Sequence, residues 1–333
     1  MGNRLYYHFK RLFSPAFKDK IKLLFLILKY DWRIAPAEFT LSPLFEGISE
    51  EEINKKFEGL DTESVNVGKY FIKRRNIPPS QYLLQLCNRD KYYPHNTKYL
   101  EKTISNEILK MTYEMHFPPE YGDVATLYFH NGLRILSENV LDYIRSSVFI
   151  DAGAYCGDSA IMFLKYEPHK VISFEPSSAN RELYKNIMRL NHIPEEKYFL
   201  CDWGLSSEDT TVFFSEKSDS SNSLLTEGNQ EVKVVKLDSF LQEYDFGRIG
   251  LIKADLEGMG LKALSGAEKT IRKHRPVLAL SIYHNQEEFF GIYSTLKQWN
   301  LNYKFKVVSL EPVSHEEITL LGVPMEVEGP VIK

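Results

Sequence analysis

The pattern of apolar and polar positions changes near residue 147. Before it, apolar residues recur at roughly helical spacing, as in Ile104–Met115, and prolines interrupt them repeatedly. From Val148 onward, short apolar runs alternate with amphipathic stretches of helix length, a pattern typical of βαβ units and a mostly parallel sheet. We therefore predict a mainly helical N-terminal accessory region, residues 1–146, followed by an α/β domain, residues 147–333.

The α/β domain contains seven apolar runs of strand length. They are Val148–Asp151, Lys170–Glu175, Tyr198–Asp202, Gly250–Asp255, Val277–Ile282, Tyr303–Ser309 and Ile318–Gly322. Helices are predicted between them at Asp158–Tyr166, Ala179–Leu190, Leu261–His274 and Gln286–Asn300. A hairpin, Thr211–Phe214 with Val232–Lys236, interrupts the alternation after the third strand.

Composition narrows the class of protein. The 333 residues are 43% apolar and 26% charged, as is usual for globular proteins in solution. A net charge of −4 argues against nucleic acid as the main partner. Cys87, Cys156 and Cys201 form neither a disulfide framework nor a zinc pattern and fit a reducing compartment. A cytoplasmic location is therefore expected.

Basic residues surround a short apolar run, Ile21–Leu28, near the N-terminus. The run is far shorter than the roughly 20 residues that a membrane-spanning helix needs, and no small-residue cleavage site follows it. Two interpretations remain. The segment is either a helix that docks its apolar side on the rest of the protein or an interfacial helix whose Lys and Arg residues meet anionic lipid.

A glycine-containing loop follows the first strand of the α/β domain. Its sequence runs Asp-Ala-Gly-Ala-Tyr-Cys-Gly-Asp from Asp151 to Asp158, and Gly153 and Gly157 have G-x-x-x-G spacing instead of the dinucleotide pattern G-x-G-x-x-G. The two flanking carboxylates would repel a pyrophosphate but suit a sulfonium and an amino group. The loop therefore favours S-adenosylmethionine over NAD, and Tyr155 joins these four residues as a candidate for cofactor binding. The alternative is a simple tight turn.

Two further strand ends carry candidate nucleotide contacts. Glu175, followed by Pro176, ends the second strand, where an acid can accept hydrogen bonds from both ribose hydroxyls. Asp202 and Trp203 follow the third strand and can contact an adenine by hydrogen bonding and by stacking or lining its pocket. The alternatives are an exposed loop glutamate for Glu175 and a packing residue for Trp203.

Candidate acceptor-side groups follow the fourth and fifth strands. Asp255 and Glu257 lie two residues apart after Lys253-Ala254, and His284 follows Ile282-Tyr283. A histidine beside two carboxylates can deprotonate a hydroxyl or bind a divalent cation. We favour a general base and predict no metal, because no further carboxylate completes an oxygen-rich site. A structural imidazole is the alternative for His284.

The order of these motifs resembles the FkbM family of methyltransferases, which have the Rossmann-like class I fold. The resemblance covers about Val148 to Gly322. It rests on the glycine loop, Phe174-Glu175-Pro176, Asn180, Leu183, Asn186, Asn191, Leu237-Asp238, Lys253-Ala254-Asp255-Leu256-Glu257-Gly258 and Leu264-Ser265-Gly266-Ala267. It implies a class I, mostly parallel seven-stranded sheet, S-adenosyl-L-methionine as cofactor, and methylation of a hydroxyl on a sugar, polysaccharide precursor or secondary metabolite.

The chain departs from the family at two positions. Gly260 stands where the family usually has a glutamate soon after the Glu-Gly pair, and Ser281 lies in a segment where the family often has an acid before the histidine. We expect the methionine part to be held by Asp151 and Gly153, the ribose by Glu175 and the adenine by Asp202. His284, or Asp255 in its place, would take the proton while Glu257 orients the base or the acceptor. The departures motivate a second reading, a cofactor-binding or scaffold protein without turnover; an NAD-dependent oxidoreductase is a third.

Overall fold

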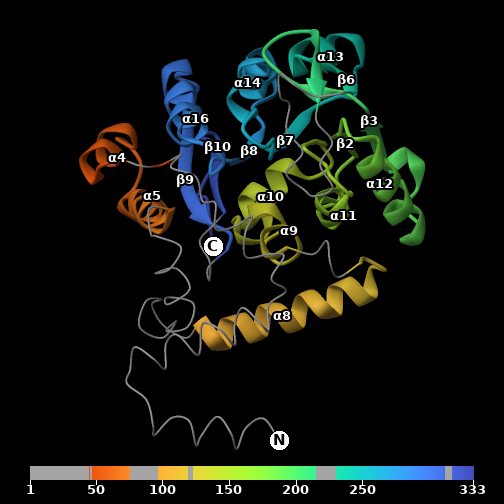
Figure 1. Ribbon diagram of the computed structural model, residues 1–333, viewed down its shortest axis with the longest axis horizontal. Helices are drawn as coiled ribbons and strands as arrows, with labels where there is room; N and C mark the ends of the chain where they lie inside the picture. Colours follow the sequence, from red (N-terminus) through yellow and green to blue (C-terminus); the bar gives the residue numbers. More distant parts are fainter. Residues whose placement is uncertain (1–44, 46, 76–96, 119–122, 215–229, 312–316) are drawn as a thin grey trace, which may run out of the picture.

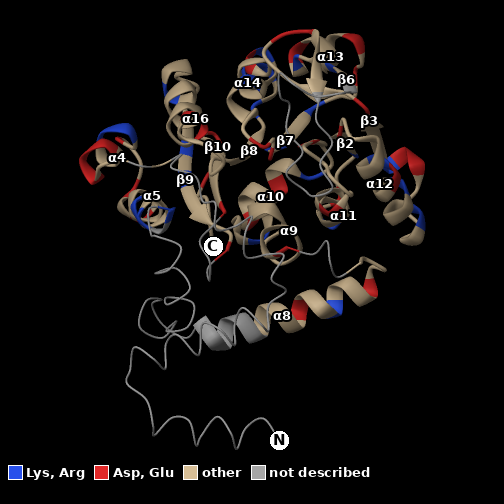
Figure 2. Cartoon of the chain, viewed as in Figure 1, with Lys and Arg blue, Asp and Glu red and all other residues tan. Residues whose placement is uncertain are grey.

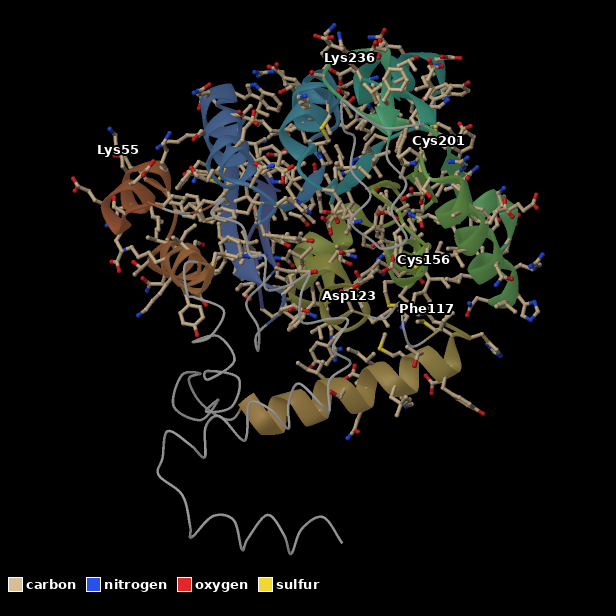
Figure 3. The ribbon with its side chains drawn as sticks, in the orientation of Figure 1. Lys55, Phe117, Asp123, Cys156, Cys201 and Lys236 are labelled. Atoms are coloured by element: carbon tan, nitrogen blue, oxygen red, sulfur yellow. The ribbon has the colours of Figure 1, made fainter. Side chains whose placement is uncertain are left out.

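The computed structural model describes residues 45, 47–75, 97–118, 123–214, 230–311 and 317–333. The basic segment around Ile21–Leu28 and Cys87 lie outside these residues. Within them, none of the helices combines the length and apolar character that crossing a membrane requires. Cys156 and Cys201, labelled in Figure 3, are buried and form no disulfide.

A seven-stranded sheet forms the centre of the molecule (Figure 1). Its strands are β1 Val148–Ala152, β2 Lys170–Phe174, β3 Tyr198–Cys201, β7 Ile249–Ala254, β8 Val277–Ser281, β9 Tyr303–Ser309 and β10 Ile318–Pro324. The spatial order is β3-β2-β1-β7-β8-β10-β9, with β10 antiparallel to both of its neighbours and the other pairs parallel. The predicted mostly parallel, Rossmann-like sheet is confirmed.

Helices cover both faces of the sheet. One face packs against α8 Thr97–Glu114, α9 Val124–Leu127, the 3₁₀ segment η3 His130–Ile135, α10 Glu138–Ile144, α11 Asp158–Leu164 and α12 Ser178–Leu190. The other face packs against α4 Glu50–Lys56, α5 Thr62–Arg75, α13 Leu237–Glu243, α14 Gly260–Ser265, α15 Glu268–His274 and α16 Gln286–Trp299. Because each strand alternates its side chains between the faces, neighbours such as Phe149 and Ile150 enter different cores.

The described helices of the N-terminal region share these cores with the sheet. Phe57 and Phe71 are fully buried and pack against Phe289 of α16. The hydroxyl of Ser64 on α5 accepts a hydrogen bond from the backbone of Val307 on β9 at 3.0 Å. Apolar burial on this scale stabilises both parts together, so α4 and α5 support the outer strands of the sheet.

The predicted single helix Leu261–His274 is wrong, because the chain forms two helices, α14 and α15, separated at Gly266-Ala267. A Cβ atom on Gly266 would overlap the carbonyl oxygen of Ser206, so the backbones approach closely here. The carbonyl of Gly266 accepts from the backbone N–H of Asp238, and the Asp238 carboxylate accepts from the N–H groups of Lys269 and Thr270. Asp238 therefore caps a second helix where the pattern alone suggests one.

The predicted hairpin is present and belongs to a small second sheet. Its strands are β5 Thr210–Phe214 and β6 Gln230–Val235, with the short strand β4 Gly204–Leu205 beside β6. The helix α13 directly after β6 is absent from the sequence prediction. Figure 2 shows acidic and basic residues interspersed on outer helices such as α4 and α12.

Candidate active site

Five parallel strands, β1, β2, β3, β7 and β8, end at one edge of the sheet, and the predicted motifs follow these ends. The chain leaves β1 toward β2 and β3 on one side and later returns through β7 and β8 on the other. Ligands of open α/β sheets bind at the carboxyl edge where the strand order reverses. The loops after β1, β2, β7 and β8 therefore meet at the expected position for a ligand.

The loop after β1 has three residues with left-handed backbone conformation. The φ angles are 79° at Gly153, 46° at Tyr155 and 88° at Gly157. A Cβ on Gly153 would overlap the carbonyl oxygen of Asp255, and one on Gly157 would lie 2.8 Å from the ring of Tyr184. Both glycines are thus required by backbone geometry and by close packing.

Glu175 lies in the bend after β2 and holds the β1 loop in place. One carboxylate oxygen accepts from the backbone N–H of Tyr155 at 2.9 Å and the other from that of Ser177 at 2.8 Å. The residue is only 5% exposed, and burial raises the pKa of this carboxyl to about 7 despite these hydrogen bonds. Each oxygen keeps a further lone pair, so Glu175 can also accept from ligand hydroxyls.

Pro176 shapes the same bend through its carbonyl. The guanidinium of Arg181 on α12 donates to the carbonyl of Glu175 at 3.0 Å and to that of Pro176 at 2.6 Å. These two bonds fix the backbone that carries the Glu175 side chain. The contribution of Pro176 is therefore to the shape of the bend.

Asp151 is fully buried and lies beneath the loop. Its carboxylate forms an ion pair with Lys253 Nζ at 3.1 Å, and Lys253 also donates to the carbonyl of Gly153 at 2.8 Å. Burial alone would lower the pKa of Lys253, but Asp151, Asp255 and Asp158 raise it above its ordinary value. Since no part of the Asp151 side chain reaches solvent, it acts on the loop through Lys253.

Asp158 is the first residue of α11 and is also buried. Its carboxylate accepts from the N–H of Ser159 at 2.8 Å. Burial, followed by the negative charge of Asp123, raises the pKa of Asp158 to about 8. Asp123, labelled in Figure 3, lies at the N-terminus of α9 and accepts from the N–H of Thr126 at 2.6 Å.

Asp202 and Trp203 follow β3 at the edge of the same region. Asp202 is exposed, and Trp203 is half-buried against the ring of Phe240. The ammonium of Lys233 lies 3.4 Å from the centroid of the indole ring, a cation–π contact. One face of Trp203 is therefore covered by Lys233 in this structure.

Asp255, His284 and Glu288 form a row of charged side chains after β7 and β8, in which His284 pairs with a carboxylate on each side. His284 Nε2 lies 3.0 Å from Asp255 Oδ1, and His284 Nδ1 lies 2.8 Å from Glu288 Oε2. The side chain of Asp255 is 28% exposed, whereas those of His284 and Glu288 are 8% and 1% exposed. Asp255 is thus the member of the row that faces solvent.

The charges in this row stabilise one another. Burial alone would raise the pKa of Asp255, but His284, Lys253 and the hydroxyl of Tyr283 lower it to about 2. Burial alone would lower the pKa of His284, but Asp255 and Glu288 raise it to about 10. At neutral pH Asp255 is therefore a carboxylate and His284 an imidazolium.

Glu257 borders this row. Its carboxylate lies 4.0 Å from His284 Nε2, and its side chain is 37% exposed. The backbone of Glu257 has a φ of 47°, a conformation that costs a non-glycine residue about 1–3 kcal/mol. Such strain concentrates at functional sites, and here it accompanies a second carboxylate beside the Asp255–His284 pair.

Sequence reasoning missed several residues of this region. They are Lys253, Asp123, Glu288 and Glu317. Burial, followed by the charges of Asp123 and Asp255, raises the pKa of Glu317 well above its ordinary value. Lys253 could have been found from the sequence, because a lysine inside an apolar strand is buried and a buried charge needs a partner. Within the described residues, no three His, Cys, Asp or Glu side chains are arranged to hold a metal ion.

Comparison with known proteins agrees with this geometry. Residues 151–315 match the methyltransferase FkbM domain. The crystal structure of methyltransferase FkbM from Methylobacillus flagellatus KT superposes with a TM-score of 0.53 at 19% identity, covering 81% of this chain and 57% of that chain. The O-methyltransferase from Bacillus cereus, in complex with SAH, gives a TM-score of 0.40 at 10% identity, covering 66% of this chain and 90% of that chain. No protein with a curated description matches the sequence.

These findings differ in what they establish. At 19% identity, the structural similarity shows the fold, and the chain spans a little over half the length of the Methylobacillus protein. The domain match covers the glycine loop, Glu175, Asp255 and His284. The chain therefore carries a methyltransferase FkbM domain at residues 151–315, within the Rossmann-like sheet described above.

Proposed function

We propose that this enzyme transfers a methyl group from S-adenosylmethionine to a hydroxyl group of a sugar, a polysaccharide precursor or a secondary metabolite. One observation carries the proposal: the Glu175 bend and the Asp255–His284 pair open at the same edge of the sheet. The Gly153 loop lies directly against the backbone of Asp255. A donor at the first site would therefore present its methyl group to an acceptor at the second.

The donor side fits a nucleoside with a cationic group. Glu175 would accept hydrogen bonds from the ribose hydroxyls while its present bonds to Tyr155 and Ser177 keep it in place. Gly153 and Gly157 let the backbone turn beside the methionine part, and Asp158 would face its positive charge. Asp202 and Trp203 would border the adenine. Asp151 would support the Gly153 carbonyl through Lys253.

On the acceptor side, Asp255 is the group best placed to receive a proton. Both ring nitrogens of His284 lie beside carboxylates, so neither presents a free lone pair to a substrate. Asp255 has an exposed carboxylate, and the imidazolium keeps it ionised. This geometry favours the alternative in which Asp255 acts in place of His284 and His284 orients it.

When bound, the cofactor would supply an electrophilic methyl group on a sulfonium. The acceptor oxygen would form its new bond to carbon as the carbon–sulfur bond breaks, and its proton would pass to Asp255. Glu257 would orient the acceptor from the other side of the opening. Holding the reacting atoms in line supplies much of the rate acceleration in such a transfer.

Asp255→Asn tests this assignment, because the amide keeps the shape of the side chain but is a far weaker proton acceptor. We expect turnover on a panel of hydroxyl-bearing sugars and metabolites, measured as S-adenosylhomocysteine release, to fall about 10²–10⁴-fold. Binding of S-adenosylhomocysteine by calorimetry should stay intact. Unchanged turnover in Asp255→Asn would refute the proton-transfer role. Methyl transfer to nitrogen or carbon acceptors alone would refute the hydroxyl substrate class.

A further inference from the structure

Gly260 is the first residue of α14, and a carboxylate from α16 lies beside it. The backbone N–H of Gly260 donates to Glu288 Oε1 at 2.5 Å. A Cβ atom on Gly260 would lie 2.9 Å from the same oxygen, which is closer than real Cβ atoms come. The absence of a side chain at position 260 thus makes room for the Glu288 carboxylate.

Both carboxylate oxygens and the backbone N–H of Glu288 have partners within the protein. It belongs to the first turn of α16, and its backbone N–H donates to the side chain of Asn285, the N-cap of that helix. Its second carboxylate oxygen, Oε2, lies 2.8 Å from His284 Nδ1. With 1% of the side chain exposed, Glu288 contacts no substrate and acts only through Gly260 and His284.

His284 is held from two sides by this arrangement. His284 Nδ1 contacts the carboxylate of Glu288, which belongs to α16. His284 Nε2 contacts the carboxylate of Asp255, which lies in the loop after β7. Glu257 lies 4.0 Å from Nε2, and the ring of Tyr283 is tilted against the imidazole with centroids 4.1 Å apart. His284 in turn lowers the pKa of Glu317, which burial raises. Because Glu288 fixes Nδ1, it also fixes the direction in which Nε2 meets Asp255.

We propose that Glu288 is a positioning residue for methyl transfer, holding His284 against Asp255 with a carboxylate that enters from α16. This inference rests on the proposed role of the Asp255–His284 pair. The bare backbone of Gly260 gives the Glu288 carboxylate the space and the N–H donor that this role needs.

The electrostatics of the row agree with this geometry. Although burial alone would lower the pKa of His284, Asp255 and Glu288 together raise it to about 10. Removing the charge of Glu288 while keeping its hydrogen-bonding shape should leave His284 with one close carboxylate. Opposite charges within 4–6 Å commonly change a pKa by about 1–3 pH units.

The test compares wild-type enzyme, Glu288→Gln and a matched control, Glu287→Gln, in the full chain. Glu287 lies in the same helical turn but is exposed. NMR titration of the His284 imidazole, assigned with His284→Asn, should give a pKa lower by about 1–3 pH units in Glu288→Gln alone. Circular dichroism melting and binding of S-adenosylhomocysteine would show that each variant is folded.

Two further variants keep the proposal falsifiable if Glu288→Gln folds poorly. Glu288→Asp retains the charge, and Glu288→Ala combined with Gly260→Glu returns a carboxylate to the same space from α14; both should bring the pKa of His284 back toward the wild-type value. With a methyl acceptor in hand, kcat and its pH profile should change in Glu288→Gln while the KM for S-adenosylmethionine stays the same.

An unchanged His284 titration in Glu288→Gln, or an equal change in Glu287→Gln, would overturn the role of Glu288. The titration needs no acceptor, so it fails or succeeds independently of the proposed function. A shifted titration together with full activity of Asp255→Asn would instead reject the proton-transfer assignment and, with it, the link from Glu288 to catalysis.

Discussion

The two halves of the sheet edge handle buried carboxylates in opposite ways. On the proposed cofactor side, Glu175 accepts from the backbone N–H groups of Tyr155 and Ser177, and burial raises its pKa to about 7. On the acceptor side, Asp255 is paired with His284, and its pKa falls to about 2. Both carboxylates follow central strands, so the difference comes from their partners.

The difference indicates which ligand charges would complement each half of the sheet edge. The proposed acceptor side carries its own cation, His284, and would need none from the neutral hydroxyl substrate proposed above. The cofactor side leaves Glu175 and Asp158 with raised pKa values, a state that suits a ligand bringing hydroxyl donors and a positive charge. Each prediction below changes one half and asks whether the other responds.

The largest effect should come from removing the cation of the acceptor side. His284→Asn leaves Asp255 and Glu288 as neighbouring carboxylates, and breaking a buried ion pair in this way costs about 3–5 kcal/mol of unfolding free energy. The folded-state pKa of His284 is raised from 6.5 to about 10. Its contribution is therefore present below about pH 6.5 and is lost as the pH rises through about 10.

Urea unfolding at pH 7 and above pH 10 measures this loss, and the gap between wild type and variant should narrow at the higher pH. His192→Asn is a suitable control, because His192 is exposed and its φ of 53° suits asparagine. Equal stability of wild type and His284→Asn at pH 7 would show that the row contributes nothing to folding.

The next effect concerns the cofactor side alone. Glu175→Ala should weaken S-adenosylhomocysteine binding by at least about 100-fold, because hydrogen bonds to a charged group are worth about 1.5–3 kcal/mol each. Calorimetry measures this, with Glu182→Ala as control, since the side chain of Glu182 on α12 is 73% exposed. The pKa of His284 should be unaffected. Similar affinities for Glu175→Ala and wild type would remove Glu175 from the binding site.

A substitution at the boundary should disturb both halves. Gly153→Ala places a Cβ against the Asp255 carbonyl at a φ of 79°. Gly247 has a φ of 91° and open space around it, so Gly247→Ala should lose only the roughly 1–2 kcal/mol of the left-handed backbone. Chemical unfolding should show a larger loss for Gly153→Ala. Equal losses would mean that the close approach is easily relieved.

The smallest effect is a pH dependence of cofactor binding. If the ligand binds the ionised forms of Glu175 and Asp158, affinity for S-adenosylhomocysteine should rise with pH, by up to about tenfold per unit for each group, and level off only above about pH 8. Calorimetry from pH 5.5 to 8.5 measures this pH dependence, and Glu175→Gln should abolish the contribution that Glu175 makes to it. Asp255 and His284, with pKa values of about 2 and 10, do not titrate in this range.

Much of the fold could be predicted because parallel strands buried on both faces appear as continuous apolar runs. All seven strands of the main sheet lie within a few residues of their predicted bounds. The break between α14 and α15 could not be predicted, since it depends on Asp238, about 30 positions away, and on the approach of Ser206. Local periodicity carries no information about such contacts.

The candidate site shows the same division. The acids at the strand ends could be placed at one edge from chain order alone, and Asp255 and His284 do lie together. The burial of Asp151 could not be inferred, because Lys253 supplies its partner from a neighbouring strand. Glu288 resembles any acidic residue in a first helical turn, a common position for acids, so nothing local distinguishes it as a partner of His284.

The contact between Gly153 and Asp255 has a consequence for how such enzymes can diversify. The N–H of Asp255 donates to the carbonyl of Ala152 at 3.0 Å, so the two loops continue the hydrogen-bonded ladder of β1 and β7. The spacing between the proposed donor site and the proposed proton acceptor would therefore follow from the strand separation, about 4.8 Å. Evolution can replace the surrounding helices and loops to accept a new substrate while this spacing stays constant.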